Sequence, residues 1–548
     1  MEFRCRIEKM SAENQNAASA GRRDLIALVT AWLLLATGAI ALARQNLSVP
    51  GLYYDEAVFG GLAKDFITGQ HHLHTPGFEL VTIFGRPFPL FVQFYLGALK
   101  SWMLMPALAL FGSSLAVLRL TSLVWALLSA LVFMLGVRRW LGLQAGIVAG
   151  AVLMVDPTFF FLGLLDWGAA ISALFCRCAA FYLIVIWWQR RSAFFLFLAG
   201  LFLGLGVFNK VDFVAFIIGV AVAAACFYGT KLWTILRDQR LVVAATIGFL
   251  IGAWPMILKI PRIVSYVGAG EGSAGAGETQ EKLHTLFSMY GGSYFYRLMD
   301  AGGLFNEMYA QPSPTHSLFG FVFVSAALLL AMIGISTHER EERRLGGFLL
   351  AGFALTTTGI FLLPGAVRIH HAVLAFPFPQ LIIATAAIHL WQRKWSLPAY
   401  WIRSLILVVV GVLFASQLFA IVKTERLLNQ TGGRGRWSNA FDAFCHDNKM
   451  RNHLTMISLD WGFNEQMAFL TNGPQLVEPF WAFSSYKSNL PPLPNKPNNV
   501  YLVHSPEYSL SHYDTAYLDA ARDGEELATA QPYFDRQGRA VFYTIRFP

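Results

Sequence analysis

The chain has 548 residues and is poor in charged side chains and in cysteine. Lys, Arg, Asp and Glu make up 14% of the sequence, against roughly 25% in typical soluble proteins. Together with 55% hydrophobic residues, this scarcity excludes a soluble globular enzyme and a disordered chain. The five cysteines do not form the dense pattern of a disulfide-stapled secreted scaffold. We therefore expect no structural disulfide.

The sequence is instead rich in apolar segments that are long enough to cross a bilayer as helices. Eleven such segments lie at about 25–43, 116–137, 143–161, 169–188, 193–209, 213–229, 241–258, 317–336, 346–363, 370–391 and 404–422. The sequence therefore predicts an all-α polytopic membrane domain of about eleven transmembrane helices over 25–422. A cytoplasmic segment at 1–24 precedes this domain.

The basic residues predict how these segments are oriented. A formal net charge of +9 would suggest nucleic acid in a soluble protein. Here the charges follow the membrane segments, and we expect no nucleic-acid partner. Lys and Arg gather in alternate connections, at Arg22, Arg23, Arg138, Arg139, Arg190, Arg191, Lys231, Arg237, Arg240, Arg340, Arg343, Arg344, Arg393, Lys394 and Arg403. Because Lys and Arg resist translocation, the pattern predicts a cytoplasmic N-terminus and an extracytoplasmic C-terminus.

Most of the mass outside the membrane is predicted on the outer face. It comprises a first outer loop at 44–115, a second at 259–316, and the tail at 423–548. In the first loop, residues 87–111 are apolar and long enough to cross, but crossing would turn every later basic cluster outward. Lys100 and a proline within this stretch also suit the headgroup boundary. We therefore expect 87–111 to form an interfacial or re-entrant helix.

The tail has the composition of a soluble domain. Strand-like runs at 453–460, 499–504 and 540–547 alternate with helical patterns at 437–449, 462–471 and 513–522, and residues 535–538 are typical of a hairpin turn. This alternation predicts a small soluble α/β domain at 423–548.

Candidate chemistry begins directly after the first apolar segment. Asp55 and Glu56 stand at the start of an amphipathic pattern, where carboxylates commonly cap a helix and complement its dipole. The alternative is a general base or a metal ligand, because a carboxylate at a lipid interface can be tuned by desolvation. Arg86 precedes the interfacial segment. It suits either a headgroup anchor or a phosphate ligand.

Further charged and titratable residues cluster at the outer ends of later segments. Asp166 lies between two apolar stretches, where a charged group usually faces a polar cavity or has a partner. Arg368, His370 and His371 lie between the ninth and tenth segments. They are consistent with a plain membrane-interface feature, with phosphate binding or with a metal site.

Two other charges occur within the apolar pattern. Asp156 precedes a proline and can simply end a helix. Arg177 lies near the middle of the fourth segment and should point into the bundle. Its partner is either an acidic residue or a lipid phosphate.

The order and sidedness of these motifs resemble a known family, the C-superfamily of membrane glycosyltransferases that use polyprenyl-phosphate sugars. The resemblance is to its branch of protein O-mannosyltransferases and lipid A aminoarabinose transferases, and it covers residues 25–230. The matching features are, in order, Asp55-Glu56, Gly85-Arg86-Pro87, the run from Phe111 to Leu120, the run from Arg138 to Gly142, and Asp166.

The resemblance implies a role for each matching residue. Asp55 would be the catalytic base, Glu56 its neighbour or a metal ligand, and Asp166 a second catalytic candidate. Arg86 would hold the donor phosphate, and we expect Arg368, His370 and His371 to assist it. The chain departs from many relatives in Trp167-Gly168, which leaves the role of Asp166 open.

The resemblance also implies a reaction. A sugar would pass from a polyprenyl-phosphate carrier to a protein, lipid or glycan acceptor on the extracytoplasmic face, with inversion at C1. No cofactor is required, and a divalent metal is left open. Membrane lipids would surround the protein, in a bacterial inner membrane. The alternatives are a secondary transporter and a non-catalytic subunit for cell-envelope assembly.

Overall fold

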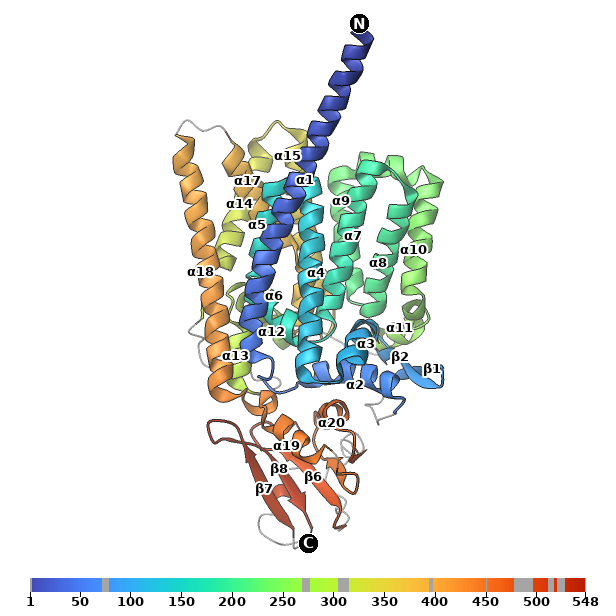
Figure 1. Cartoon of the computed structure of the whole chain (residues 1–548), viewed down its shortest axis with the longest axis vertical. Coiled ribbons are helices and arrows are strands. Elements are labelled where there is room, and N and C mark those ends of the chain that lie inside the picture. The colour runs from blue at the N-terminus through green and yellow to red at the C-terminus, as the bar shows by residue number, and fades with distance from the viewer. Residues whose placement is uncertain are drawn as a thin grey trace.

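The protein is a helical bundle with a small domain at one end (Figure 1). The computed structural model describes the chain except residues 1, 71–77, 269–275, 304–314, 394–397, 450, 478–495, 511–516, 520–527 and 548. The N-terminus lies at one end of the bundle and the C-terminal domain at the other.

The bundle contains the predicted membrane segments. In the described part of the chain, nine helices are long and apolar enough to cross a membrane, and a bent helix pair counts as a tenth. The remaining predicted segment is α8, which is one of two shorter apolar helices, the other being Leu99–Phe111. The predicted segments correspond to α1 (Glu2–Ala43), α4 (Leu115–Leu141), the pair α5 (Leu143–Met154) and α6 (Pro157–Leu165), α7 (Ala170–Arg190), α8 (Ala193–Asn209), α9 (Phe213–Leu236), α10 (Gln239–Ile257), α14 (Phe319–Ser336), α15 (Arg340–Leu362), α16 (Ile369–Ala372) with α17 (Phe378–Gln392), and α18 (Ala399–Thr431). The predicted fold class is confirmed.

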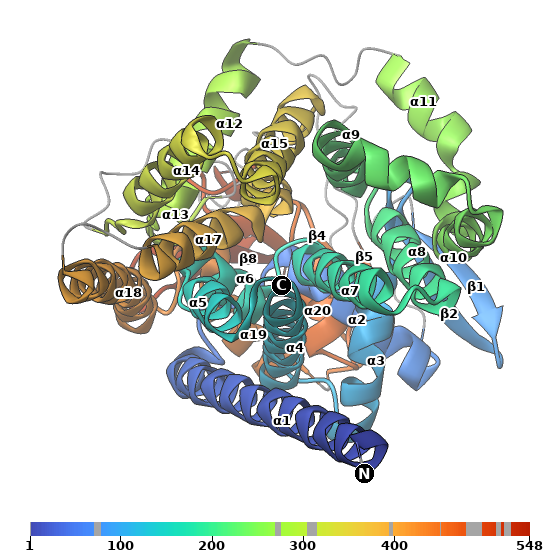
Figure 2. The same cartoon turned by 90° about the horizontal axis from the view of Figure 1, so that it is seen from above.

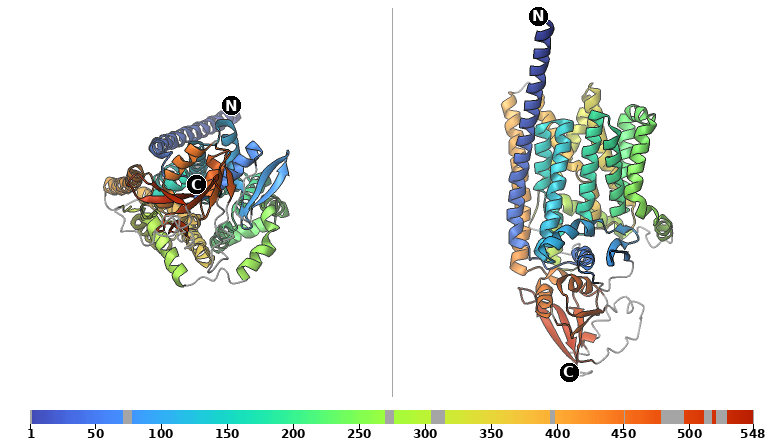
Figure 3. Two further views of the ribbon diagram at one scale, coloured as in Figure 1. Left: turned by 90° about the horizontal axis from the view of Figure 1, so that it is seen from below. Right: turned by 45° about the vertical axis from the view of Figure 1, so that its right-hand side comes forward.

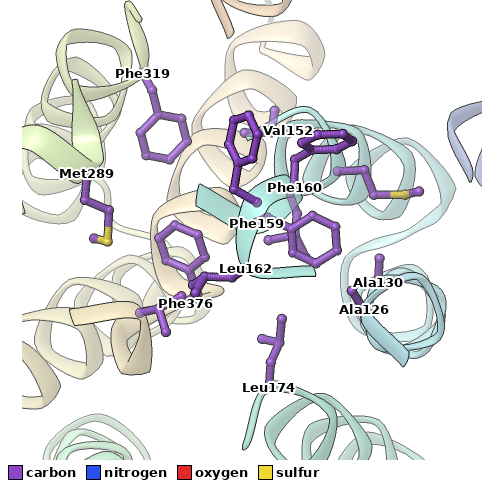
Figure 4. Packing of buried hydrophobic residues seen from close by; sticks show 14 of the residues in the cluster. Ala126, Ala130, Val152, Phe159, Phe160, Leu162, Leu174, Met289, Phe319 and Phe376 are labelled. Atoms are coloured by element: carbon purple, nitrogen blue, oxygen red, sulfur yellow. The ribbon is translucent and has the colours of Figure 1, made fainter. Parts of the chain in front are cut away.

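Helices α4, α5, α6 and α7 lie in the interior of the bundle, and α1 lies along its edge (Figure 2). Around α6, Phe159 and Phe160 pack with Phe319 of α14 and with Phe376 (Figure 4). Small residues allow the helices to approach closely, as is common in membranes. A Cβ atom on Gly163 of α6 would lie only 3.0 Å from the Cβ of Ala126 on α4.

Two breaks in the bundle are stabilised by charged side chains. Between α5 and α6, which are bent by 64°, the Asp156 carboxylate accepts hydrogen bonds from the N–H groups of Thr158 and Phe159 at 2.8 and 3.2 Å. Asp156 is therefore the N-cap of α6. The sequence had suggested that it ends a helix, but it begins one. Arg177 donates to the carbonyls of Val373 and Phe376 at the break before α17. It points into the bundle as expected, and these two acceptors are carbonyls and not a carboxylate.

The segment predicted as the first outer loop contains α2 (Tyr54–Thr68), a small antiparallel sheet and α3 (Leu99–Phe111). It lies at the end of the bundle next to the C-terminal domain, which we call the outer end after the predicted orientation. The sheet comprises β1 (Glu79–Ile83), β2 (Arg86–Gln93) and β3 (Leu96–Gly97). The expected helix over 87–111 is therefore wrong for its first half, which forms strands. Pro87 and Pro89 lie in this half, and two closely spaced prolines disfavour a helix because each lacks the N–H and clashes with the preceding turn.

The described part of the second outer loop is helical. It comprises α11 (Ile260–Gly268), α12 (Ala276–Tyr290) and α13 (Tyr294–Ala301), which lie at the same end of the bundle as α2 (Figure 1).

The C-terminal domain is a mixed sheet with helices, as the tail sequence predicted. Its strands follow the order β5-β4-β6-β8-β7. They are β4 (Thr455–Ser458), β5 (Gln475–Val477), β6 (Asn499–His504), β7 (Thr529–Phe534) and β8 (Ala540–Arg546), and its helices include α19 (Ala440–Asn448) and α20 (Asn464–Leu470). The Asp535 N–H donates to the Arg539 carbonyl at 2.9 Å, which confirms the hairpin turn. The expected helix at 513–522 lies mostly outside the described residues, and α18 continues past the expected boundary at 422.

A buried ion pair joins the bundle to the first outer loop. Arg119 of α4 donates from Nε and Nη2 to the two carboxylate oxygens of Glu56 at 2.9 and 3.0 Å. Its guanidinium also donates to the carbonyls of Leu47, Pro50 and Gly51. Both side chains of the pair are almost completely buried. These bonds position α2 on the outer end of α4.

We expect Arg119→Met to destabilise the protein by about 3 to 5 kcal/mol, because it leaves the Glu56 carboxylate buried and unpaired. Unfolding in detergent micelles, followed by circular dichroism, measures this loss. Lys231→Met is the matched control. It removes a pair with Glu341 whose side chains are 39% and 64% exposed, and its cost should stay below about 1 kcal/mol. Equal losses in both variants would contradict the role given to Arg119.

Candidate functional site

Helix α2 lies between the outer end of the bundle and the C-terminal domain (Figure 3). Its first turn carries the two carboxylates singled out in the sequence. Glu56 accepts from the Tyr53 N–H at 3.2 Å, within a capping box, and both of its oxygens also face Arg119. A metal ion at Glu56 would have to displace this arginine. Glu56 thus has the capping surroundings that one reading of the sequence allowed.

Asp55 has different surroundings from Glu56. The residue as a whole is half-buried, and its carboxylate accepts hydrogen bonds from the backbone N–H of Gly168 and from the side chain of Trp167. Burial raises the pKa of Asp55 to about 6, although the positive charges of Lys100 and Lys210 act in the opposite direction. At neutral pH Asp55 is mainly ionised and can accept a proton.

Lys100, on α3, lies against the loop that donates to Asp55. Its Nζ is 3.3 Å from Oδ2 of Asp166 and donates to the carbonyls of Asp166 and Gly168 at 2.5 and 3.1 Å. The other Asp166 oxygen accepts from the Ile171 N–H at 3.2 Å. The candidate Asp166 is therefore buried in an ion pair with Lys100, and together they order the loop 166–169.

A second lysine–aspartate pair lies in the turn between α8 and α9. The Nζ of Lys210 is 3.4 Å from Oδ2 of Asp212 and 3.3 Å from both ring nitrogens of His371. The same Asp212 oxygen lies 2.8 Å from Nδ1 of His371. Burial raises the pKa of Asp212, but Lys210 and His371 lower it by more, so that it falls to about 2. An antiparallel bridge between Lys210 and Leu96 aligns this turn with the first outer loop.

His370 packs on the loop beside Asp55. A Cβ atom on Gly168 would lie 3.2 Å from the His370 ring, and the ring centroid is 5.7 Å from that of Trp167. Gly168 has a φ of 67°, a conformation that favours glycine. The structure thus brings Asp55, Asp166, His370 and His371 to one place.

Of the two predicted arginines, Arg368 lies close enough to His370 and Tyr53 to interact with them electrostatically, whereas Arg86 lies elsewhere. Arg368 is buried, and its Nη2 is 3.2 Å from Oε1 of Glu281 on α12. Arg86 is exposed and donates to the carbonyls of Phe66 and Ile67, at the far end of α2 from Asp55. Ile67 lies twelve positions after Asp55 on this helix, which is about 18 Å along the axis. Arg86 thus lies apart from Asp55, and its predicted role at the donor phosphate stays a prediction.

Lys100, Lys210 and Asp212 were not predicted as site residues. In the sequence, Lys100 indicated only that residues 87–111 do not cross the membrane. The available signal was a short connection, Asn209 to Asp212, with opposite charges between two apolar helices. Such charges usually face a polar cavity or a partner. Among the described residues, no three His, Cys, Asp or Glu side chains are placed to bind a metal ion.

The C-terminal domain packs on the first turn of α2. The Trp437 ring stacks on Tyr53 with centroids 3.8 Å apart, and Trp461 lies against Tyr54 at 4.1 Å. Trp437 also contacts Trp167 edge to face. Aromatic side chains from the domain and the bundle thus surround the residues that flank Asp55.

Comparison with known proteins identifies the fold. No protein-family model and no curated protein matches the sequence. The structure is similar to crystal structures of ArnT from Cupriavidus metallidurans, bound to undecaprenyl phosphate (12% identity, TM-score 0.55, covering 94% of this chain and 97% of that chain) and in the apo state (13% identity, TM-score 0.53, 94% and 98%). It is also similar to the Archaeoglobus fulgidus oligosaccharyltransferase tethered with an acceptor peptide (12% identity, TM-score 0.51). That match covers 83% of this chain and 64% of the other. At these identities the likeness shows a shared fold.

The position of Lys100 predicts how Asp55 titrates. We expect Lys100→Met to move the pKa of Asp55 from about 6 to a higher value, because it removes a positive charge that favours the carboxylate. Infrared difference spectra recorded across a pH series measure this shift, with Asp55→Asn identifying the band. In the control Lys449→Met, which alters an exposed lysine of the C-terminal domain, the band should titrate as in the unchanged protein. A band that titrates alike in all three proteins would contradict the assignment.

Proposed function

We propose that the chain is a membrane glycosyltransferase that moves a sugar from a polyprenyl-phosphate carrier to an acceptor at the outer end of the bundle. The observation that carries this proposal is Asp55, a proton-accepting carboxylate between two buried lysine–aspartate pairs. The fold supports it, because ArnT with this fold binds undecaprenyl phosphate. An oligosaccharyltransferase with this fold was solved with an acceptor peptide.

In the proposed reaction Asp55 is the general base. It takes the proton from an acceptor hydroxyl or amide while the oxygen or nitrogen forms a bond to C1 of the donor sugar. The bond between C1 and the phosphate oxygen breaks, and the electron pair leaves with the polyprenyl phosphate. Attack from the side opposite to the phosphate inverts C1. Because the leaving group is already an anion, no strong general acid is required.

We propose that the donor phosphate lies near Lys210, His370 and His371, with Lys100 and Arg368 as further positive charges. Lys100 and Lys210 are buried, and fixed charges away from water stabilise developing negative charge more strongly than exposed ones. Arg86 is left out of this proposed phosphate site because it lies at the opposite end of α2. No step of the proposed reaction requires a metal.

The proposed orientation follows the basic residues. The helix ends that carry the described residues of the clusters assigned to the cytoplasm lie at the N-terminal end of the bundle, opposite to α2 and the C-terminal domain (Figure 1). We propose a bacterial inner membrane, with the transfer site and the C-terminal domain on its outer side.

Asp55→Asn tests the reaction directly. We expect it to lower sugar transfer by about 10²- to 10⁴-fold, the usual contribution of a general base, while binding of undecaprenyl phosphate is retained. In the unchanged protein turnover should fall about tenfold per pH unit below about 6, since protonation removes the base. Purified protein in nanodiscs, with polyprenyl-phosphate sugars and an acceptor extract, supports both measurements. Full turnover in Asp55→Asn would reject the base, and carrier movement without sugar transfer would favour a transporter.

A second experiment locates the phosphate. We expect Lys210→Met to weaken binding of undecaprenyl phosphate at least about tenfold, as for loss of a charged hydrogen bond. Lys210→Arg should preserve most of the affinity. Arg86→Met should change the affinity less than about threefold, because its guanidinium bonds to the end of α2. Fluorescence titration against the lipid measures all three variants. A larger loss in Arg86→Met than in Lys210→Met would reverse the assignment.

A further inference from the structure

The C-terminal domain forms hydrogen bonds with the chain at both ends of α2. Before the helix, the Gly51 N–H donates to the Trp437 carbonyl at 2.7 Å, and the Leu52 N–H lies 3.1 Å from each oxygen of the Asp442 carboxylate. Near its other end, the Lys64 ammonium donates to three carbonyls at the end of α20, those of Ala468, Phe469 and Thr471, at 2.8, 2.9 and 2.6 Å. Both the entry to α2 and its last turns are therefore placed by the domain.

The fit between α2 and the domain is close as well as polar. A Cβ atom on Gly51 would lie 2.3 Å from the Ser438 carbonyl oxygen, and one on Gly60 would lie 3.0 Å from the Phe469 ring. No side chain larger than hydrogen fits at Gly51 without backbone movement. A shift of the domain would therefore move the segment that leads into Asp55.

Asp442 is the charged group in this contact. It lies on α19, and burial raises its pKa to about 7, although the Leu52 N–H and the Arg119 charge favour the ionised form. Glu56 and Cys445 also lie close enough to interact with it electrostatically. A buried carboxylate is costly unless its hydrogen bonds compensate. The Leu52 N–H that it accepts from stands three residues before Asp55.

We infer that Asp442 is a positioning residue for Asp55, so that the C-terminal domain sets the geometry of the proposed base. The inference rests on the proposed function. Asp55 accepts from Gly168 and Trp167 of the bundle, and these directional bonds require that the first turn of α2 keeps its place. Two side chains fix the segment before this turn from opposite sides. Asp442 of the domain accepts from the Leu52 N–H, and Arg119 of the bundle donates to the Gly51 carbonyl. Misplacement of a reacting group by about 1 Å can cost roughly 100-fold in rate.

The test compares Asp442→Ala, Asp442→Asn and the control Asp447→Asn, a change at an exposed residue of the same helix. Full-length protein in nanodiscs is used for two measurements. The first is the pH dependence of sugar transfer, with the KM for the donor. The second is hydrogen exchange of a peptide covering 47–58, which does not depend on activity.

We expect Asp442→Ala to lower kcat about tenfold or more, with a change in donor KM below about threefold. The acid limb of its pH profile should move up by about one pH unit, because a displaced Asp55 loses hydrogen bonds that favour its ionised form. Exchange over 47–58 should become faster. Asp442→Asn keeps an oxygen that can accept from Leu52 and should restore most of the rate, and Asp447→Asn should match the unchanged protein.

Two results would overturn the inference: a lower kcat in Asp442→Ala with an unmoved acid limb, or unchanged exchange over 47–58. Should Asp442→Ala fail to fold, Lys64→Met, which removes the contact at the other end of α2, gives the same readouts. If the acid limb of the pH profile of sugar transfer is unmoved in Lys64→Met as well, the proposed positioning of α2 by the domain is overturned. The result for Asp55→Asn separates the two proposals. Full turnover in Asp55→Asn would reject Asp55 as the general base. The exchange data would still decide whether Asp442 orders residues 47–58.

Discussion

The buried ion pair between Glu56 and Arg119 is the constraint on which the outer end of the molecule depends. Taking both charges out of water is costly, and such a pair is stable only when further hydrogen bonds satisfy the donors. Here the remaining guanidinium N–H groups donate to the carbonyls of Leu47, Pro50 and Gly51. Consecutive helical residues point about 100° apart. Once Glu56 faces α4, Asp55 therefore faces the loop at Gly168 instead, and the two adjacent carboxylates acquire different chemistry.

The charges around Asp55 are balanced in pairs. Lys100 is paired with Asp166, and Lys210 with Asp212, so each buried lysine has a compensating carboxylate within reach. Asp55 is the additional carboxylate between these pairs, and burial outweighs the attraction of the lysines for its charge. The phosphate of the proposed sugar donor would compete with Asp166 and Asp212 for the charges of Lys100 and Lys210. This arrangement is consistent with a site that binds a lipid phosphate and holds a base beside it.

The C-terminal domain belongs to this arrangement as much as the bundle does. Trp437 and Trp461 contact the two tyrosines that precede Asp55, and the domain bonds to both ends of α2. The tail of the chain thus completes a site whose first residues stand directly after the first membrane helix. Residues 390 positions apart, Leu52 and Asp442, are joined there by a hydrogen bond.

The sequence by itself determined the long apolar helices and the outline of the tail domain, because hydropathy and turn residues are local signals. The bias of Lys and Arg predicts on which side each loop lies. It also marked Asp55, Asp166, His370 and His371, whose polarity is unusual beside apolar segments. It missed strand β2, Lys100, Lys210 and Asp212, and it did not show that Arg86 lies at the other end of α2 from Asp55. Only the tertiary structure decided that Glu56 pairs with Arg119, that Arg177 bonds to carbonyls and that Asp442 reaches Leu52. Such pairings join distant parts of the chain, and their partners are chosen by packing, which leaves no periodic trace in the sequence.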